Sequence, residues 1–278
     1  MNDKIAIITG ASSGFGLLSA IELAKQEFQV VATMRDLKKA DSLLELANQA
    51  GVVKRIHLHC LDVTSIESIQ QFSEYLPRFK TIDVLVNNAG YALGGFSEEI
   101  SIDQYRQQFE TNFFGVISVT NVVLPIMRTQ GHGKIINMSS ISGKIGFPGM
   151  SPYVASKHAL EGYSESLRLE LKPFGIDVVL IEPGSYSTNI WSIIDTIPVN
   201  QDSPYHEYLN RILNQVNTGK AKHGNPLDVA KLVAEIASMQ KSPKLRYPIG
   251  KGVKLNIILK SLLPWRTLEN IILKLLLK

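Results

Sequence analysis

Residues 4–16, KIAIITGASSGFG, form the segment that decides the fold of this chain. The first half is a short apolar run rich in isoleucine, which is typical of a buried strand that ends in a turn. Gly10, Gly14 and Gly16 follow, and helical spacing of apolar residues continues from Gly16 to Lys25. Glycines at a strand-to-helix turn let the backbone approach a pyrophosphate closely, and the helix N-terminus offers free N–H groups. The segment therefore predicts a phosphate-binding turn, with a purely structural tight turn as the alternative.

Apolar runs and helical stretches alternate along the rest of the chain. Strands are expected at residues 4–9, 29–33, 56–61, 82–87, 134–138 and 177–181, and helices at 16–25, 38–50, 65–76, 102–127 and 151–172. Strands that are apolar throughout and alternate with helices favour a parallel sheet covered on both faces. We expect an α/β fold with a Rossmann-like, doubly wound parallel sheet in a single domain, followed by a helical C-terminal extension. The domain should span residues 1–250, with a lid at about 185–225 and a helix from Pro226, and the extension should span 251–278.

The composition is that of an ordinary globular protein. The 278 residues are 45% hydrophobic and 19% charged, which suits one large domain with a sizeable core. Cys60 is the single cysteine, so no internal disulfide forms, and we expect it to be a small buried apolar residue. The N-terminus lacks the pattern of a signal peptide, and no uninterrupted apolar run approaches the roughly 18 residues that span a bilayer. A cytoplasmic protein is expected.

Charge is distributed unevenly along the chain. Residues 241–278 hold nine basic side chains and one acid, Glu269, so this tail carries +8 and the remainder of the chain carries −4. The main body therefore has no basic bias that would attract nucleic acid. Apolar residues recur in the tail at helical spacing, at Leu255, Ile258, Leu262 and Trp265 and again at Leu268, Ile272 and Leu275. Two interpretations stay open: two short helices that pack on the body or close a substrate pocket, or a basic amphipathic anchor on a membrane surface.

The end of the second predicted strand bears on cofactor choice. An acidic residue there would accept hydrogen bonds from a ribose 2′-hydroxyl, but the chain has Met34 followed by Arg35. A guanidinium pairs with a 2′-phosphate, which a carboxylate would repel, and the Ser12 hydroxyl is a further candidate contact. The sequence therefore predicts NADP in preference to NAD. Asp36 leaves the NAD alternative open, as does a merely solvated Arg35.

Tyr153 and Lys157 are candidates for acid–base chemistry. Ser151 and Pro152 are typical of a helix start, so a tyrosine and a lysine four residues apart should share one helical face. A nearby ammonium favours the phenolate and should lower the tyrosine pKa from its ordinary value of about 10. The pair alone does not assign a reaction, but with the resemblance given below it makes Tyr153 the predicted general acid for carbonyl reduction and general base for alcohol oxidation. A second such pair, Tyr247 and Lys251, is interrupted by proline and glycine and is not expected to be helical.

Further motifs occur in a fixed order around this pair. The chain has TGASSGFG at residues 9–16, NNAG at 87–90, Asn112, Ser140 thirteen residues before Tyr153, and Pro183 with Gly184. Over about residues 4–230 this set resembles the short-chain dehydrogenase/reductase family, and the chain looks similar to its hydroxysteroid- and retinol-type members. The resemblance implies reversible oxidation of an alcohol to a carbonyl without a metal. It also implies a homodimer, whose usual interface helices correspond to residues 101–127 and 151–172.

The resemblance assigns roles residue by residue. It implies a catalytic set of Asn112, Ser140, Tyr153 and Lys157, in which Lys157 also holds the nicotinamide ribose, Ser140 aligns the substrate oxygen and Asn112 holds a relay water. Ser139 is the alternative to Ser140, and Asn88 either contacts the cofactor or braces the sheet. The predicted cofactor-binding residues are Gly10, Ser12, Ser13, Gly14, Phe15, Gly16, Arg35, Asp62, Val63, Asn87, Ala89, Gly90, Tyr153, Lys157, Pro183, Gly184 and Thr188.

The predicted lid indicates the substrate. It carries the apolar and aromatic residues Ile190, Trp191, Ile193, Ile194, Tyr205 and Tyr208. These residues favour an apolar alcohol or carbonyl compound as substrate, although they would equally serve to pack the helices of the lid itself. Two other functions remain as alternatives: a dinucleotide-binding regulator without turnover, and a membrane-surface scaffold that works through the tail.

Overall fold

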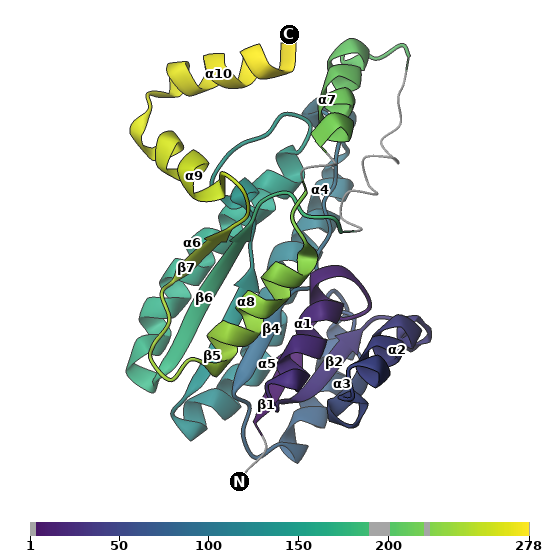
Figure 1. Ribbon diagram of the computed structural model, residues 1–278, viewed down its shortest axis with the longest axis vertical. Helices are drawn as coiled ribbons and strands as arrows, with labels where there is room; N and C mark the ends of the chain where they lie inside the picture. Colours follow the sequence, from purple (N-terminus) through teal and green to yellow (C-terminus); the bar gives the residue numbers. More distant parts are fainter. Residues whose placement is uncertain (1–3, 189–200, 220–222, 278) are drawn as a thin grey trace.

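A seven-stranded parallel sheet forms the centre of the protein (Figure 1). The structure, a computed structural model, describes residues 4–188, 201–219 and 223–277. The strand order is β3-β2-β1-β4-β5-β6-β7, so the direction of winding reverses between β1 and β4, where such folds bind ligands at the carboxyl ends of the strands. The strands are β1 (Ile5–Ile8), β2 (Gln29–Met34), β3 (Ile56–Cys60), β4 (Val84–Asn87), β5 (Gly133–Met138), β6 (Ile176–Pro183) and β7 (Arg246–Ile249). The predicted Rossmann-like α/β fold is confirmed.

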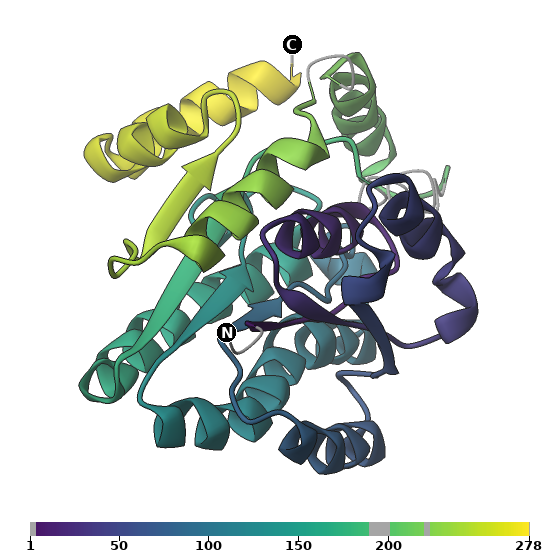
Figure 2. The same ribbon diagram turned by 60° about the horizontal axis from the view of Figure 1, so that its bottom comes forward.

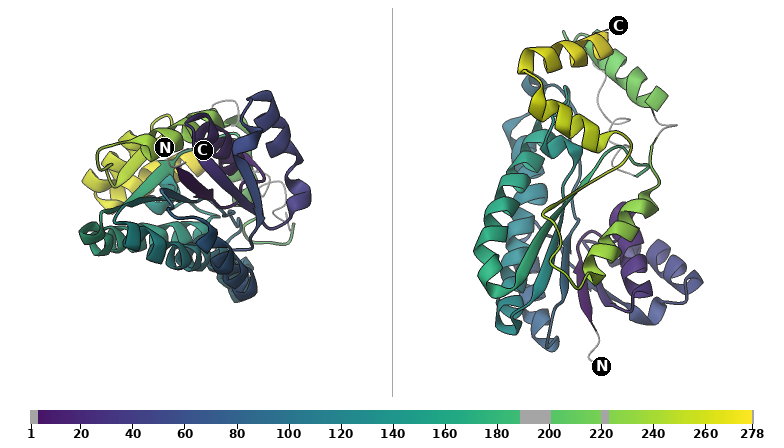
Figure 3. Two further views of the ribbon diagram at one scale, coloured as in Figure 1. Left: turned by 90° about the horizontal axis from the view of Figure 1, so that it is seen from below. Right: turned by 60° about the vertical axis from the view of Figure 1, so that its left-hand side comes forward.

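Helices cover both faces of the sheet (Figures 2 and 3). One face packs against α1 (Gly14–Lys25), α2 (Asp41–Gln49) and α8 (Pro226–Ser238). The other packs against α3 (Ile66–Tyr75), α5 (Gly115–Gln130) and α6 (Ser151–Leu171), and α4 (Ile102–Phe109) lies beside α6. Because side chains alternate along a strand, Ala6 and Ile8 of β1 enter one core and Ile7 enters the other. Every β1 residue is therefore apolar, as the sequence pattern indicates.

Two helical stretches differ from the prediction. The helix expected at 102–127 consists of α4, a π-helical segment at Glu110–Phe114, and α5. The helix expected at 38–50 consists of a 3₁₀ turn at Leu37–Lys39 followed by α2. Further 3₁₀ turns lie at Val53–Arg55, Leu76–Arg78, Ser97–Glu99, Ile141–Gly143 and Lys172–Phe174.

Strand β7 was not predicted. Its four residues include Pro248, and all of them are only half-buried, so neither apolar content nor alternation marks them as a strand. The strand exists because it pairs with β6, with Leu180 opposite Arg246 and Pro183 opposite Ile249. It also brings Arg246 beside α6, where the guanidinium pairs with Glu161 and Glu165.

The prediction for Cys60 is wrong. This residue ends β3, the edge strand of the sheet, and its thiol is exposed and donates to the Arg35 carbonyl oxygen at 3.4 Å. An edge strand is covered less completely than a central one, and a sequence pattern does not tell which strand takes the edge.

The helical segment Ile102–Gln130 is long and apolar enough, by composition, to cross a membrane. Val119, Val123 and Met127 of this segment are fully buried in the core between α5 and the sheet. Packing against the sheet accounts for the apolar character of its inner face.

Three helices lie beyond the carboxyl ends of the strands, at the end of the molecule opposite the N-terminus (Figure 1). They are α7 (His206–Gly219), α9 (Val253–Leu262) and α10 (Trp265–Leu277), and α10 contacts α7. The two helices α9 and α10 make up the predicted extension. Val253 anchors α9 with a buried side chain, whereas most of the apolar residues that follow it are exposed.

Candidate active site

The glycine turn between β1 and α1 is closely packed. Gly10 and Gly14 have φ of +68° and +58°, in the left-handed region that favours glycine. A Cβ on Gly10 would lie 2.8 Å from the Ala89 Cα, and one on Gly16 would collide with the Gly10 carbonyl oxygen and the Asn88 amide. The turn therefore sits directly against the loop that follows β4, and larger residues do not fit.

Asn88 braces this turn. Its Nδ2 donates to the carbonyl oxygens of Thr9 and Gly10 at 2.9 and 3.1 Å. The Thr9 hydroxyl in turn accepts from the backbone N–H groups of Asn88 and Ala89, at 3.0 and 2.9 Å. Asn88 therefore braces the glycine turn itself. The sequence reasoning did not assign this role to Thr9, although Thr9 lies next to the first glycine.

The N-terminus of α1 opens toward the loops at the carboxyl ends of the strands. Ser13 is the N-cap residue, and no side chain caps the helix within the described ranges. The backbone N–H groups of the first turn are thus available to an anion. Thr188 lies over the turn, since its Cβ is 3.8 Å from where a Gly14 Cβ would be, and the Phe15 ring packs edge-on to Tyr186 at 5.6 Å. These features suit a pyrophosphate at the turn.

The end of β2 presents a cation beside this turn. Met34 is buried and Arg35 is exposed, while the Asp36 carboxylate accepts from the Lys38 N–H at 3.0 Å and so caps the following 3₁₀ turn. A pocket lies between the glycine turn and the start of α2, and it is lined by Ser12, Ser13, Lys38, Lys39, Asp41 and Ser42. The two lysines were missed by the sequence reasoning, although they follow Arg35 closely.

The other predicted cofactor residues line the same end of the sheet. Asp62 accepts from the N–H and hydroxyl of Thr64, at 2.9 and 2.8 Å, and Val63 is buried against Gly115. Asn87 is buried at the end of β4, where its Nδ2 donates to Thr120 Oγ1 and Asn137 Oδ1, at 3.0 and 2.9 Å. Pro183 ends β6, so Gly184 follows at the carboxyl edge, and Gly90 lies against the Asn112 side chain.

Tyr153 and Lys157 lie on the first turns of α6 and are both buried. The helix begins at Ser151, so Met150 rather than Ser151 is its N-cap residue. The Lys157 ammonium donates to the Met138 carbonyl oxygen at 2.6 Å and lies 5.7 Å from the centroid of the Tyr153 ring. The helix thus brings the phenol and the ammonium to the carboxyl end of β5.

The two neighbouring serines differ in their partners. Ser140 accepts from the Ser142 N–H at 3.1 Å, and its hydroxyl is close enough to Tyr153 to lower the pKa of that phenol by hydrogen bonding. The Ser139 hydroxyl donates instead to the Glu161 carboxylate at 2.6 Å. Ser140 is therefore the serine that faces the tyrosine.

Asn112 is held by the π-helical segment. Its Oδ1 accepts from the Tyr91 N–H at 3.1 Å, and its Nδ2 donates to the Tyr91 carbonyl oxygen at 2.9 Å and to Ser156 Oγ at 3.3 Å. Single π-turns inside helices are frequent at functional sites. This one ties the helix to the loop after β4 and to α6, so Asn112 lies between the two.

Burial dominates the ionisation of the pair. It raises the pKa of Tyr153 above its ordinary value, and the Ser140 hydrogen bond opposes this only in part. Burial also lowers the pKa of Lys157 to about 8, against the opposing effect of the Glu161 charge. The predicted lowering of the tyrosine pKa is thus wrong in its net direction, because the sequence shows the nearby lysine but not the depth of burial.

Only part of the predicted lid is described. Ile190, Trp191, Ile193 and Ile194 lie outside the described residues. The rings of Tyr205 and Tyr208 pack on Phe96, and their centroids lie 4.2 and 5.4 Å from the Phe96 centroid. The described part of the chain contains no group of three His, Cys, Asp or Glu side chains placed to hold a metal ion.

Known proteins resemble this chain along nearly all of its length. A family model for short chain dehydrogenases matches residues 4–196. The chain is 54% identical over 278 residues to the uncharacterized oxidoreductase YusZ of Bacillus subtilis (strain 168), covering 99% of each. It is 35% identical to the 3-ketodihydrosphingosine reductase of Bacteroides thetaiotaomicron, covering 91% of this chain and 90% of that one. The solved structure of actinorhodin polyketide ketoreductase with NADPH matches with a TM-score of 0.78 at 31% identity, covering 91% of this chain and 97% of that one.

Proposed function

The chain belongs to the short-chain dehydrogenase/reductase family, and on that premise we propose that it is an NADP(H)-preferring oxidoreductase that interconverts an apolar alcohol and its carbonyl compound. The observation that carries the proposal is that the candidate catalytic residues and the anion-binding start of α1 lie at the same edge of the sheet. Ser140, Tyr153 and Lys157 are gathered at the end of β5, and the uncapped start of α1 lies at the same edge, after β1.

The residues act on a substrate oxygen. A bound nicotinamide dinucleotide supplies the hydride in carbonyl reduction and accepts it in alcohol oxidation. The Tyr153 hydroxyl donates a proton to the developing alkoxide, or removes one from the alcohol in the reverse direction. Ser140 donates a hydrogen bond that holds the same oxygen, Lys157 stabilises the phenolate that forms, and Asn112 holds the water through which the proton is replaced.

The glycine turn suits the dinucleotide for physical reasons. Its backbone approaches closely because Gly10 and Gly14 adopt left-handed conformations, and no side chain competes for the first N–H groups of α1 within the described ranges. The preference for NADP is supported by Arg35, by Ser12 and by Lys38 and Lys39 beside the turn. The NADPH of the similar ketoreductase agrees with this assignment.

An apolar substrate is the finer part of the proposal. Phe96 packs on Tyr205 and Tyr208 of the predicted lid, and one relative of similar length is named 3-ketodihydrosphingosine reductase. An apolar substrate partitions from water into lipid. We therefore include in the proposal a cytoplasmic location with peripheral membrane contact through α9 and α10, whose exposed face is apolar and flanked by cations.

A homodimer is also part of the proposal. The helices that pair in this family correspond to α4–α5 and α6, and each carries exposed apolar surface within the described chain. Leu169 of α6 is 78% exposed, and Phe114, just before α5, is 46% exposed. Light scattering on the purified protein gives the mass that decides between monomer and dimer.

Turnover with a Tyr153→Phe variant tests the proposed function. We expect the wild type to oxidise NADPH with long-chain or polycyclic ketones, and the variant to lose about 100- to 10,000-fold in kcat because it lacks the acidic hydroxyl. NADPH binding, measured by fluorescence titration, should stay within a few-fold in the variant. Tight NADPH binding by a wild type that turns over none of the carbonyls or alcohols would favour a dinucleotide-binding regulator instead.

A further inference from the structure

We propose that Glu161 is a positioning residue of this active site, which holds Ser139 in place and sets the charge around Lys157, and that Arg246 of β7 and Lys144 hold it in turn. The inference rests on the proposed function, because it assigns a role in preparing the same site. No motif of the sequence pointed to this carboxylate.

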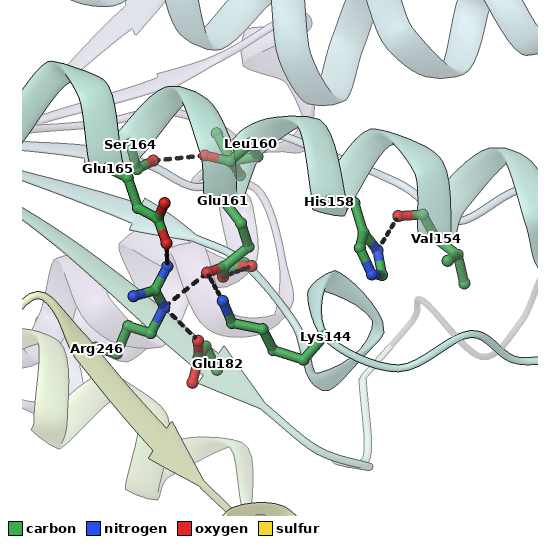
Figure 4. Close-up of polar contacts among 10 residues, drawn as sticks. Lys144, Val154, His158, Leu160, Glu161, Ser164, Glu165, Glu182 and Arg246 are labelled. Atoms are coloured by element: carbon green, nitrogen blue, oxygen red, sulfur yellow. Dashed lines mark hydrogen bonds and ion pairs between the residues drawn. The ribbon is translucent and has the colours of Figure 1, made fainter. Parts of the chain in front are cut away.

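Glu161 is a buried carboxylate whose oxygens both have partners. Its side chain is 5% exposed. Oε1 accepts from the Ser139 hydroxyl at 2.6 Å, and Oε2 pairs with the Lys144 ammonium and with Arg246 Nε, each at 2.9 Å. Figure 4 shows these cations converging on Glu161 from the turn after β5 and from β7. A charge buried so deeply is tolerated because it is paired and hydrogen-bonded.

The hydrogen bond between Glu161 and Ser139 helps to fix the backbone of the neighbouring catalytic serine, Ser140. Ser139 directly precedes Ser140, and its N–H is already tied to the Ile181 carbonyl oxygen at 2.9 Å. Gly143 closes over the contact, since a Cβ there would lie 2.9 Å from Ser139 Oγ and 3.0 Å from Glu161 Cγ. The backbone that carries Ser140 is thus fixed from both sides, and Glu161 supplies one of the two attachments.

Glu161 also lies one helical turn from the catalytic lysine. Lys157 and Glu161 are four residues apart on α6, and the carboxylate raises the pKa of Lys157 against the burial that lowers it to about 8. Other charged or titratable groups near the pair are Tyr153 and Glu165 on α6, Lys144 after β5, Glu182 on β6 and Arg246 on β7. Without the carboxylate, the ammonium would lose its proton at a lower pH.

Arg246 links the last strand to this arrangement. It pairs with Glu161 and Glu165 of α6, and its Nε lies 3.3 Å from Glu182 Oε1 (Figure 4). Burial and then the Glu161 charge raise the pKa of Glu182 to about 7. Glu182 is therefore only partly ionised at neutral pH, whereas Glu161 is the buried carboxylate that pairs with both Lys144 and Arg246. Strand β7 thereby contributes to the site through Arg246.

Two matched variants separate this role from a purely structural ion pair. Glu161→Gln and Glu165→Gln each remove a carboxylate partner of Arg246, but only Glu161 contacts Ser139 and faces Lys157. In protein labelled with ¹³C at lysine Cε, we expect the Lys157 titration midpoint to fall by about one unit in Glu161→Gln and to stay unchanged in Glu165→Gln. The Lys157→Met spectrum identifies the resonance.

Kinetics supply a second readout. Glu161→Gln should lower kcat at least tenfold and move the alkaline limb of the pH profile to lower pH. The KM for NADPH should stay within about twofold. Glu165→Gln should match the wild type in both. Equal Lys157 midpoints in Glu161→Gln and wild type would overturn the proposal. The titration needs no turnover, so it decides this inference even if the proposed reaction is wrong.

Lys144→Met keeps the test decisive if Glu161→Gln does not fold. It removes a cation from Glu161, so the Lys157 midpoint should rise, which is the opposite sign to that of Glu161→Gln. An unchanged or lowered midpoint in Lys144→Met would overturn the assigned charge coupling.

Discussion

Arg35 is the single side chain on which the proposed cofactor preference depends most. It is exposed beside the glycine turn, so removing it should disturb little of the fold. We expect Arg35→Ala to weaken NADPH binding by about 10- to 100-fold, the loss of a charge-assisted contact to phosphate, and to leave NADH binding within about twofold. Fluorescence titration with each dinucleotide measures both constants.

Arg55→Ala is the control for this change. Arg55 directly precedes β3, and its guanidinium donates to the Glu27 carbonyl oxygen at 3.0 Å. The variant therefore removes a cation at a position other than the end of β2. It should alter neither constant. Parallel losses for NADPH and NADH in Arg35→Ala would contradict the 2′-phosphate assignment and point to a general loss of binding.

Spacing in the sequence predicts some residue roles well and others poorly. Tyr153 and Lys157 share a helical face because four residues make about one turn, and the structure places them so. Glu161 lies on the same face, one turn further along, but its importance depends on partners from distant segments, Lys144 and Arg246. Cys60 was misjudged for the same reason, because strand order decides its exposure.

At the scale of elements, the glycine turn depends on a brace from the loop after β4. Asn88→Ala removes the two hydrogen bonds to Thr9 and Gly10 and leaves those carbonyl oxygens without this partner. We expect a loss of about 1–3 kcal/mol in the free energy of unfolding, seen as a lower Tm, together with weaker NADPH binding. Thermal unfolding and dinucleotide titration measure the two effects.

Asn48→Ala is the matched control, because Asn48 is exposed near the end of α2 and is not part of the brace of the glycine turn. Its Tm and NADPH affinity should equal those of the wild type within error. If Asn88→Ala kept wild-type stability and affinity, the bracing role would be refuted.

The elements that escaped prediction are those made by pairing or interruption. Strand β7 owes its conformation to β6, and nothing in its own four residues is typical of a strand. The π-helical turn at Glu110–Phe114 leaves the apolar spacing of the surrounding helix nearly intact, so periodicity predicts one continuous helix. The other six strands, β1 to β6, were predicted because each is largely apolar by itself and bounded by turns or helices.

At the scale of the whole molecule, the C-terminal extension leaves an unusual surface. Leu255, Ile258, Leu259, Leu262 and Trp265 are between 38% and 75% exposed. Exposed lysines and arginines flank them at Lys251, Lys254, Arg266 and Lys274. An apolar face with cations on its flanks is suited to an anionic bilayer surface, where leucine and tryptophan enter the acyl boundary and lysines meet the headgroups. The proposed lipid-derived substrate would then reach the lid helix α7, which α10 contacts, from the membrane.

Flotation with liposomes tests this orientation. We expect the full-length protein to float with vesicles that contain about one-third anionic lipid, weakly with neutral vesicles, and less as salt rises. The double variant Leu262→Glu with Trp265→Glu should lose flotation, because both side chains are exposed and their replacement leaves the core intact. Ile66→Glu, which changes an 82% exposed apolar residue on α3, should float like the wild type. Flotation that survives the double variant would show that α9 and α10 do not make the contact. Unchanged turnover of a soluble ketone in that variant would show that the extension serves access to the membrane, separately from the chemistry at Tyr153.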